Sequence, residues 1–169
     1  QPELDFGTGD FSIDAWIRDF GNNQKQAVVD KLDVSPGGSG FALYFESWLL
    51  KLNINGTTFA STTAITQGNP LANTGPWYHI AATVSRSTGI GTLWINGVPA
   101  GPVFVPPTAS VNNALPLWIG ETRLLPSPGE IAIDELELFN RALSAQEVMD
   151  LYLAGPSGKC KPDKADLGD

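Results

Sequence analysis

The pattern that decides the fold lies in residues 76–107, PWYHIAATVSRSTGIGTLWINGVPAGPVFVPP. From Tyr78 to Val84, apolar residues occupy every second position, the period that turns one face of a β-strand toward a core. The alternation resumes at Leu93, and Asn96-Gly97 then fits a two-residue type I′ turn that returns the chain through Val98 to Val105. Three antiparallel strands with one apolar face cannot stay folded alone, so we expect a second layer to cover that face.

The same alternation recurs along most of the chain. It predicts a core strand at Phe11 to Arg18. Further strands are predicted at Gln26 to Leu32, Phe41 to Phe45, Trp48 to Asn53, Thr57 to Thr63 and Leu115 to Glu121, with a second Asn-Gly turn at Asn55-Gly56. About nine or ten strands, spaced by roughly 8 to 12 residues, are typical of a β-sandwich.

The last predicted strand, Ile131 to Phe139, carries an irregularity. Its apolar alternation slips at Asp134-Glu135, where a β-bulge would return both apolar pairs to the core. A helix follows, because Ser144 to Glu147 fit a capping box, Leu143 and Val148 occupy the staple positions, and Gly155 ends the pattern. We therefore predict an all-β chain, a two-sheet antiparallel β-sandwich (jelly roll) over residues 1–155 with one short C-terminal helix. Residues 156–169 are predicted to be an extended or flexible tail.

Composition excludes several classes of function. The 169 residues carry a formal net charge of −8 and no basic run, so a nucleic-acid partner is not expected. No apolar run approaches the roughly 18 to 20 residues of a membrane span, so membrane insertion is not expected either. The one cysteine, Cys160, cannot form an internal disulfide; it either pairs outside this chain or is an incidental thiol. The first residue is Gln1 rather than Met, which favours a module of a larger multidomain chain.

Three segments carry a family resemblance. They are Leu4 to Arg18, Gly75 to Val98 and Gly129 to Gly155, which contain a Phe-x-Ile-acid-Ala-Trp strand, a Trp-x-His strand, and an Ile-Asp-Glu strand followed by Arg-x-Leu-Ser and a helix. The chain closely resembles the laminin G-like, concanavalin A-like jelly rolls that are modules of bacterial secreted and surface proteins. The resemblance implies the sandwich fold and a secreted or cell-surface location. It decides little about activity, since members include carbohydrate-binding modules, adhesion modules, pentraxin-like lectins and some glycoside hydrolases.

The residues do not favour an enzyme. The related laminarinases and lichenases carry Glu-x-Asp-x-Glu on one strand, whose acids serve as nucleophile and acid/base. The nearest stretch here keeps Glu135 and Glu137 but has Ile133 where the first acid belongs. His79 is the one histidine, and its position in the family is that of a structural strand residue. A glycoside hydrolase with a degenerate site is therefore the second alternative, behind a protein-binding adhesion or spacer module.

Five tryptophans favour a carbohydrate-binding module. Trp16, Trp77, Trp94 and Trp118 have the parity opposite to the aliphatic stripe of their strands, and Trp48 opens another strand. Because sugar rings stack on flat indoles, we predict carbohydrate binding at Trp48, Trp77, Trp94 and Trp118. The alternative is that these rings cover the outer sheet faces or lie under the C-terminal helix.

The resemblance also implies a structural calcium ion, Ca²⁺. Relatives often ligate one through an Asp near the C-terminal strand and through backbone carbonyls of the N-terminal segment and an early loop. Asp134 matches that Asp, while Asp5, Asp10 and the turn that ends at Gly40 are candidates for the remaining ligands. We expect a non-catalytic module whose partner is a carbohydrate or, alternatively, an extracellular protein.

Overall fold

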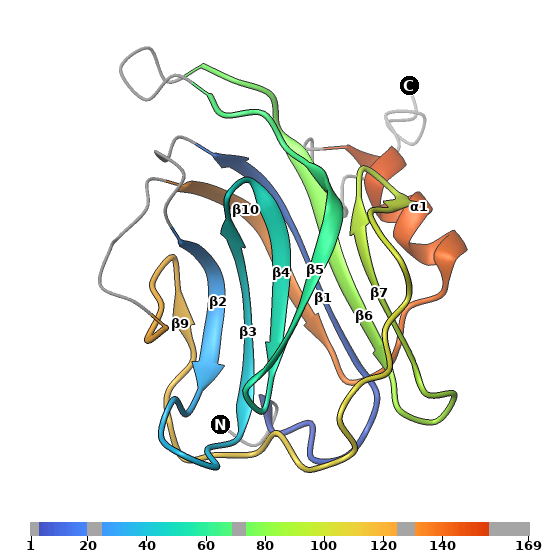
Figure 1. The fold of residues 1–169 in the computed structure, drawn as a ribbon. Coiled ribbons are helices and arrows are strands. Elements are labelled where there is room, and N and C mark those ends of the chain that lie inside the picture. Colours follow the sequence, from blue (N-terminus) through green and yellow to red (C-terminus); the bar gives the residue numbers. More distant parts are fainter. Residues whose placement is uncertain (1–3, 20–24, 69–73, 125–130, 156–169) are drawn as a thin grey trace, which may run out of the picture.

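The computed structural model describes residues 4–19, 25–68, 74–124 and 131–155. Within these ranges, two antiparallel sheets face each other and one α-helix lies against the outer side of sheet A (Figure 1). Sheet A has the order β10-β1-β6-β7-β8, with β1 Phe11–Asp19, β6 Tyr78–Ser85, β7 Ile90–Ile95, β8 Val98–Pro99 and β10 Ile131–Phe139. Sheet B has the order β5-β4-β3-β2-β9, with β2 Gln26–Leu32, β3 Gly40–Glu46, β4 Leu49–Ile54, β5 Thr57–Ala64 and β9 Trp118–Ile119. The helix is α1, Ala145–Ala154, so the predicted β-sandwich with one short C-terminal helix is confirmed.

The core fills the space between the two sheets. Alternate residues of four strands point into it and expose 1% or less of their surface: Phe11, Ile13, Ala15, Ile17, Ile80, Ala82, Val84, Phe41, Leu43, Phe45, Leu50, Leu52 and Ile54. Burying one large side chain of this kind stabilises the fold by about 1.5–3 kcal/mol. The period-two pattern of the sequence therefore identified the inward faces of both sheets.

Both Asn-Gly turns form as predicted. Asn55 and Gly56 join β4 to β5 with φ values of 50° and 82°, and Asn96 and Gly97 join β7 to β8 with 52° and 76°. Positive φ at both central positions is the requirement of a type I′ turn, which matches the twist of the strands it joins. Oδ1 of Asn96 also accepts a hydrogen bond of 3.0 Å from the backbone N–H of His79.

The predicted β-bulge is present in β10, where it pairs with β1. Asp134 lies opposite Trp16 and Glu137 lies opposite Asp14, so two residues of β10 oppose Ala15 alone. Glu135 has a φ of 50°, a left-handed conformation that takes up the extra residue. Apolar residues on both sides of the bulge consequently pack against the core, as the alternation required.

Helix α1 begins with the predicted capping box. The backbone N–H of Glu147 donates to Oγ of Ser144 over 3.2 Å, and the backbone N–H of Ser144 donates to Oε2 of Glu147 over 2.8 Å. Leu143 and Val148, the staple residues, are both buried against sheet A. Gly155 follows the last turn with a φ of 71°. The cap and the staple together fix where the helix starts and which side it presents to the sheet.

Two strands are shorter than predicted. The return strand expected at Val98 to Val105 is limited to β8 and one bridge between Gly91 and Phe104. Prolines interrupt it because they have no N–H to donate, and the carbonyl oxygen of Ala100 instead accepts hydrogen bonds from two residues of β5. The strand expected at Leu115 to Glu121 is the two-residue β9. The predicted tail, with Cys160, lies outside the described residues.

Candidate functional site

Trp94, one of the predicted sugar-binding residues, lies under helix α1. Its side chain is 7% exposed and packs with Ala81, Leu143 and Val148. Its Nε1 donates to Oγ1 of Thr83 over 3.0 Å. The helix covers this part of sheet A, so the Trp94 ring has no free face for a sugar. The ring lies under the C-terminal helix, which was the alternative to sugar binding.

Trp48 and Trp77 are half-buried and lie next to strands of different sheets. Trp48 occupies the turn between β3 and β4 with a φ of 59°, and its ring packs against the core. Trp77 precedes β6, and the Cζ atom of Arg18 lies 4.6 Å from the centre of its ring. Both rings therefore already have protein contacts on part of their surface.

Trp118 is the most accessible of the predicted tryptophans. It lies in β9 at the edge of sheet B, where 37% of its surface is exposed, and the neighbouring Ile119 is 57% exposed. The guanidinium of Arg123 stacks on the ring, with Cζ 3.7 Å from the ring centre. Such a cation–π contact holds the indole in one orientation and leaves the rest of its surface accessible.

Asp30 of β2 anchors this arrangement. Its carboxylate is fully buried, and Oδ2 accepts hydrogen bonds from Oγ1 of Thr122 over 2.8 Å and from the backbone N–H of Arg123 over 2.6 Å. Nη1 of Arg123 lies 3.1 Å from Oδ1 of the same carboxylate. A buried charge with several charge-assisted partners is strongly held, so the segment that follows β9 is fixed to sheet B.

A pocket of about 500 Å³ lies beside this edge, where strand β2 ends. It is lined by Asp5, Lys31, Asn113, Ala114, Leu115 and Pro116, and we call it the end pocket. Lys31 is 3% exposed, and its Nζ donates to the backbone oxygen of Asn113 over 2.7 Å and to Oδ1 of Asn113 over 3.2 Å. Oδ1 of Asp5 lies 3.6 Å from the same Nζ. A buried ammonium needs such partners, and they fix the polar groups of the pocket.

The end pocket and Trp118 are joined by one short segment. Pro116 lines the pocket, and its carbonyl oxygen accepts a hydrogen bond of 2.9 Å from Nη2 of Arg123, the residue that stacks on Trp118. The indole and the polar pocket are therefore held in a fixed relation. We call the two together the β9-edge site.

Gly40, predicted as part of the calcium site, lies against Lys31 and Asn113, two residues that line the end pocket. Its φ is 126°, and a Cβ atom there would collide with the carbonyl oxygen of Lys31 and lie 2.5 Å from Nδ2 of Asn113. That Nδ2 donates to the backbone oxygens of Lys31 and Ser39, each over 2.8 Å. Glycine is needed at this position so that the Asn113 amide can approach the backbone.

Asp10, another predicted calcium ligand, ties the β6–β7 turn to the N-terminal segment. Oδ1 accepts from the backbone N–H groups of Arg86 and Ser87 over 2.6 and 3.0 Å, and Oδ2 accepts from the Ser87 hydroxyl over 2.8 Å. Partial burial works against the charged form of Asp10, but the hydrogen bonds from Ser87, Arg86 and Ser85 outweigh it and lower the pKa of this carboxyl. Its role in the structure is to hold a turn.

The four predicted calcium ligands are not gathered at one point. Asp134 pairs with Trp16 of β1, which lies six residues along the chain from Asp10, a separation of roughly 20 Å at the rise of a β-strand. Among the described residues, no three His, Cys, Asp or Glu side chains form a group that could hold a metal ion. These four residues lie too far apart to bind one ion together. Calcium binding therefore stays a prediction. Its candidate at the bulge is the exposed side chain of Asp134.

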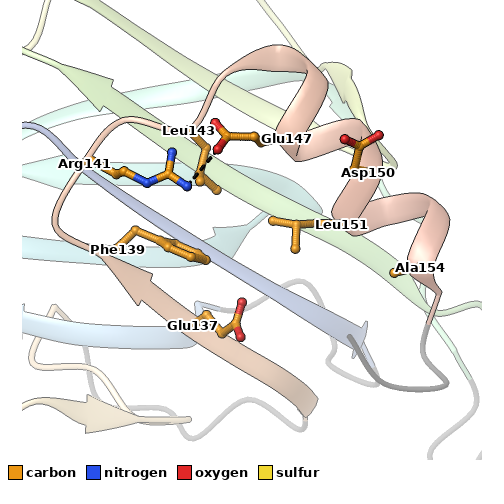
Figure 2. A pocket seen from close by; sticks show the side chains of 8 residues that line it. All are labelled: Glu137, Phe139, Arg141, Leu143, Glu147, Asp150, Leu151 and Ala154. Carbon is orange, nitrogen blue, oxygen red and sulfur yellow. Dashed lines mark ion pairs between the residues drawn. The ribbon is translucent and has the colours of Figure 1, made fainter. Parts of the chain in front are cut away.

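A second pocket, of about 350 Å³, lies between β10 and helix α1. Its lining residues are Glu137, Phe139, Arg141, Leu143, Glu147, Asp150, Leu151 and Ala154, and we call it the helix groove. Figure 2 shows Glu137 and Phe139 extending from β10 on one side, Leu151 extending toward them from the helix, and Arg141 paired with Glu147 above the Phe139 ring. Nη2 of Arg141 lies 2.7 Å from Oε1 of Glu147.

The ion pair at the helix groove also lowers the pKa of the Glu147 carboxyl. The Arg141 side chain, together with the backbone and hydroxyl of Ser144, lowers the pKa of Glu147 from its ordinary 4.5 to about 2. Because the folded-state pKa is depressed, the stabilisation by this carboxylate is present above pH 4.5 and is lost as the pH falls toward 2. At neutral pH the helix start and Arg141 are therefore held by a charged Glu147.

Glu135, Glu137 and His79, the residues considered for an enzyme, do not lie together in a cleft between the sheets. Glu135 is the bulge residue, and Glu137 faces helix α1 across the groove rather than a cleft between the sheets. His79 is fully buried, with Nε2 3.2 Å from Oδ2 of the equally buried Asp14. The rings of Trp16 and Tyr152 lie 5.5 and 6.2 Å from its ring centre, so neither group of this pair reaches solvent.

The sequence analysis missed Lys31, Asn113, Asp30 and Arg123, which organise the β9-edge site. One signal was available: Asp30 and Lys31 are two adjacent charged residues inside QAVVDKL, a predicted strand with several apolar residues. Charged side chains are almost never fully buried unless they are paired, so their presence in such a strand indicates partners. Asn113 and Arg123 lie 82 and 93 residues from their partners Lys31 and Asp30, beyond the reach of local patterns.

A two-sheet antiparallel sandwich with an exposed edge site and a short helix on one outer face is the architecture of lectin-like jelly-roll domains. The sequence matches the family described as the concanavalin A-like lectin/glucanases superfamily, laminin G type, over residues 1–149. The chain belongs to this family, which confirms the resemblance found in its strands. A comparison with curated proteins found no match.

Solved structures share the fold at low sequence identity. The binding domain of Paraclostridial Mosquitocidal Protein 1 is 22% identical with a TM-score of 0.64, covering 88% of this chain and 38% of that one. A putative carbohydrate-binding protein from Bacteroides ovatus is 15% identical with a TM-score of 0.66, covering 85% and 40%. The Trypanosoma rangeli sialidase is 18% identical with a TM-score of 0.59, covering 88% and 23%. The chain thus spans well under half the length of these relatives, and the likeness establishes the fold.

Proposed function

We propose that the chain is a non-catalytic module of a secreted or cell-surface protein and that it binds carbohydrate at the β9-edge site. The observation that carries this proposal is the exposed Trp118 indole, which Arg123 orients and which follows Pro116, a lining residue of the polar end pocket, by two positions in the chain. An indole of this kind supplies a stacking surface for a sugar ring, and nearby carboxylate and amide groups supply partners for its hydroxyls.

The chemistry of the end pocket favours a neutral sugar. Asp5 and Lys31 contribute opposite charges that lie 3.6 Å apart, so their sum is zero. Asn113 adds an amide, and the chain as a whole carries −8, which opposes the approach of an acidic glycan. Sugar hydroxyl groups can donate to Asp5 without adding a net charge to the site.

Two further observations support a binding role over hydrolysis. Glu135 and Glu137 do not face each other across a cleft, since one is the bulge residue and the other lines the helix groove. Two of the similar structures are described as binding proteins, namely the toxin binding domain and the putative carbohydrate-binding protein. Helix α1, the one α-helix in the described part of the chain, is neither long nor apolar enough to cross a membrane.

The proposal is tested by glycan-array screening followed by calorimetry with the best neutral glycan. We expect Trp118→Ala to weaken binding at least about tenfold, the scale of 1.4 kcal/mol for an interface aromatic. The matched control is Trp77→Ala, which removes another tryptophan paired with an arginine, on the other sheet. Affinity that survives Trp118→Ala, or falls equally in Trp77→Ala, would place the sugar elsewhere. An array with no bound glycan would reject carbohydrate binding itself.

A further inference from the structure

Helix α1 packs against the turn that joins β7 to β8. Gly97 of this turn is buried, although its neighbour Val98 is 52% exposed. Side chains of the helix fill the space above the glycine, since a Cβ atom there would lie 2.9 Å from Sδ of Met149 and 3.1 Å from Cδ1 of Tyr152. Residues three apart on a helix lie on the same side, so both side chains reach the turn from one side of α1.

The turn is a firm support for these two side chains. The backbone N–H of Asn96 donates to the carbonyl oxygen of His79 over 2.7 Å, and the backbone N–H of His79 donates to Oδ1 of Asn96 over 3.0 Å. Gly97 has a φ of 76°, which favours glycine, so the sulfur of Met149 packs directly on the backbone. Because the turn is tied to β6, a larger or more polar group at Met149 would displace the helix rather than the turn.

Met149 is also the one methionine of the chain, and it is half-buried. A thioether within reach of solvent is oxidised by peroxides. The sulfur lone pair attacks one oxygen of hydrogen peroxide, an S–O bond forms and the O–O bond breaks. The sulfur loses two electrons to give a sulfoxide, and the peroxide gains them to give water. The sulfoxide oxygen makes a flexible apolar side chain polar and bulkier at a tightly packed place.

We propose that Met149 is a redox-sensitive contact, in which oxidation of the sulfur by a peroxide loosens helix α1 from the β7–β8 turn. Reduction of the sulfoxide restores the contact. The capping box at Ser144 and the buried Val148 still hold the first turn, so the loosening concerns the helix from Met149 onward. The contact lies on sheet A and the β9-edge site on sheet B, so this inference does not rest on carbohydrate binding.

The first test treats the full chain with hydrogen peroxide, in a Cys160→Ser background that leaves Met149 as the one sulfur-containing residue. Mass spectrometry should find one added oxygen on Met149. The oxidised chain should melt about 3 to 8 °C lower, and amide hydrogen exchange should be about tenfold faster in α1 but unchanged in β3 and β4. The two epimer-specific methionine sulfoxide reductases should reverse both effects. An oxidised chain with the original melting temperature and exchange rates would overturn the proposal.

The second test separates this contact from general oxidative damage. Met149→Leu conserves the side-chain volume, and peroxide should leave its melting temperature unchanged. The matched control adds Leu153→Met to that variant, which moves the thioether to a position on the same helix that is 70% exposed. The introduced methionine should be oxidised with a change of less than about 1 °C. A fall equal to that of the parent chain would reject the proposal. Failure of Met149 to react where the introduced methionine reacts fully would reject it too.

Discussion

At the scale of single residues, burial decides which polar groups can act. Lys31 is directed into the sandwich by the parity of β2, and its ammonium is usable only because Asn113 and Asp5 meet it at the end of the core. The lysine can be recognised in the sequence as an anomaly in an apolar strand, but Asn113 cannot, since a loop far along the chain supplies it. Sequence periodicity gives the direction of a side chain and not the group that it meets.

Gly40 shows how closely the end pocket depends on one backbone position. We expect Gly40→Ala to lower the free energy of unfolding by about 2 to 4 kcal/mol, because the added Cβ is both strained at a φ of 126° and pressed against Lys31 and Asn113. Gly56→Ala is the matched control, since its φ is 82° but no atom lies within 4 Å of the new Cβ. Urea denaturation should show a smaller loss in that variant, and equal losses would mean that strain alone, without crowding, explains both.

At the scale of elements, local signals located most strands but not their lengths. The bulge in β10 was predictable because the apolar parity of IAIDELELF changes within one strand, and Glu135 indeed takes the left-handed conformation. The extents of β8 and β9 were not, because an alternating segment forms a strand only where a neighbour supplies hydrogen bonds. The N–H of Ala100 still donates to Leu93 of β7, but its carbonyl oxygen accepts from Thr62 and Thr63 of β5 in sheet B, so the predicted third strand ends early.

The start of helix α1 offers an element-scale test. We expect Ser144→Ala to lower the free energy of unfolding by about 1 kcal/mol, because the variant leaves the Glu147 N–H without its capping oxygen. Ser144→Asn, which keeps a side-chain acceptor at the same position, should retain most of the stability. Thermal melts at neutral pH would compare the three chains. A wild-type melting temperature in Ser144→Ala would remove the capping role from this residue.

At the scale of the whole molecule, layers determine which predicted residues reach solvent. Trp94 and Trp118 share the same outward parity in the sequence, yet helix α1 covers one and the other lies on an open edge. The placement of a helix over sheet A depends on packing between segments distant in sequence, which no local period encodes. A candidate ring could therefore be named from its strand, while its accessibility required the assembled sandwich.

Calcium binding is the remaining prediction at the scale of the whole molecule. The placement of the candidate ligands determines the calcium affinity to expect. With Asp134 as the one carboxylate of the predicted set that lies near the bulge, an ion there would have few charged ligands from that set. A low count of charged ligands gives weak binding, with a Kd of about 10⁻⁴ to 10⁻³ M as in other extracellular modules. Calcium at tenfold above Kd would then stabilise the folded chain by about 1.4 kcal/mol.

This stabilisation should appear as a rise in melting temperature of about 3 to 5 °C when millimolar calcium is added to chain first treated with EDTA. Magnesium at the same concentration should have little effect, because it does not suit an irregular oxygen site. Asp134→Asn should abolish the rise, whereas Asp33→Asn, at a half-buried acid that directly follows β2 of sheet B, should keep it. An equal melting temperature with and without calcium, or an equal rise in Asp134→Asn, would mean that the sandwich holds its bulge by packing and hydrogen bonds alone.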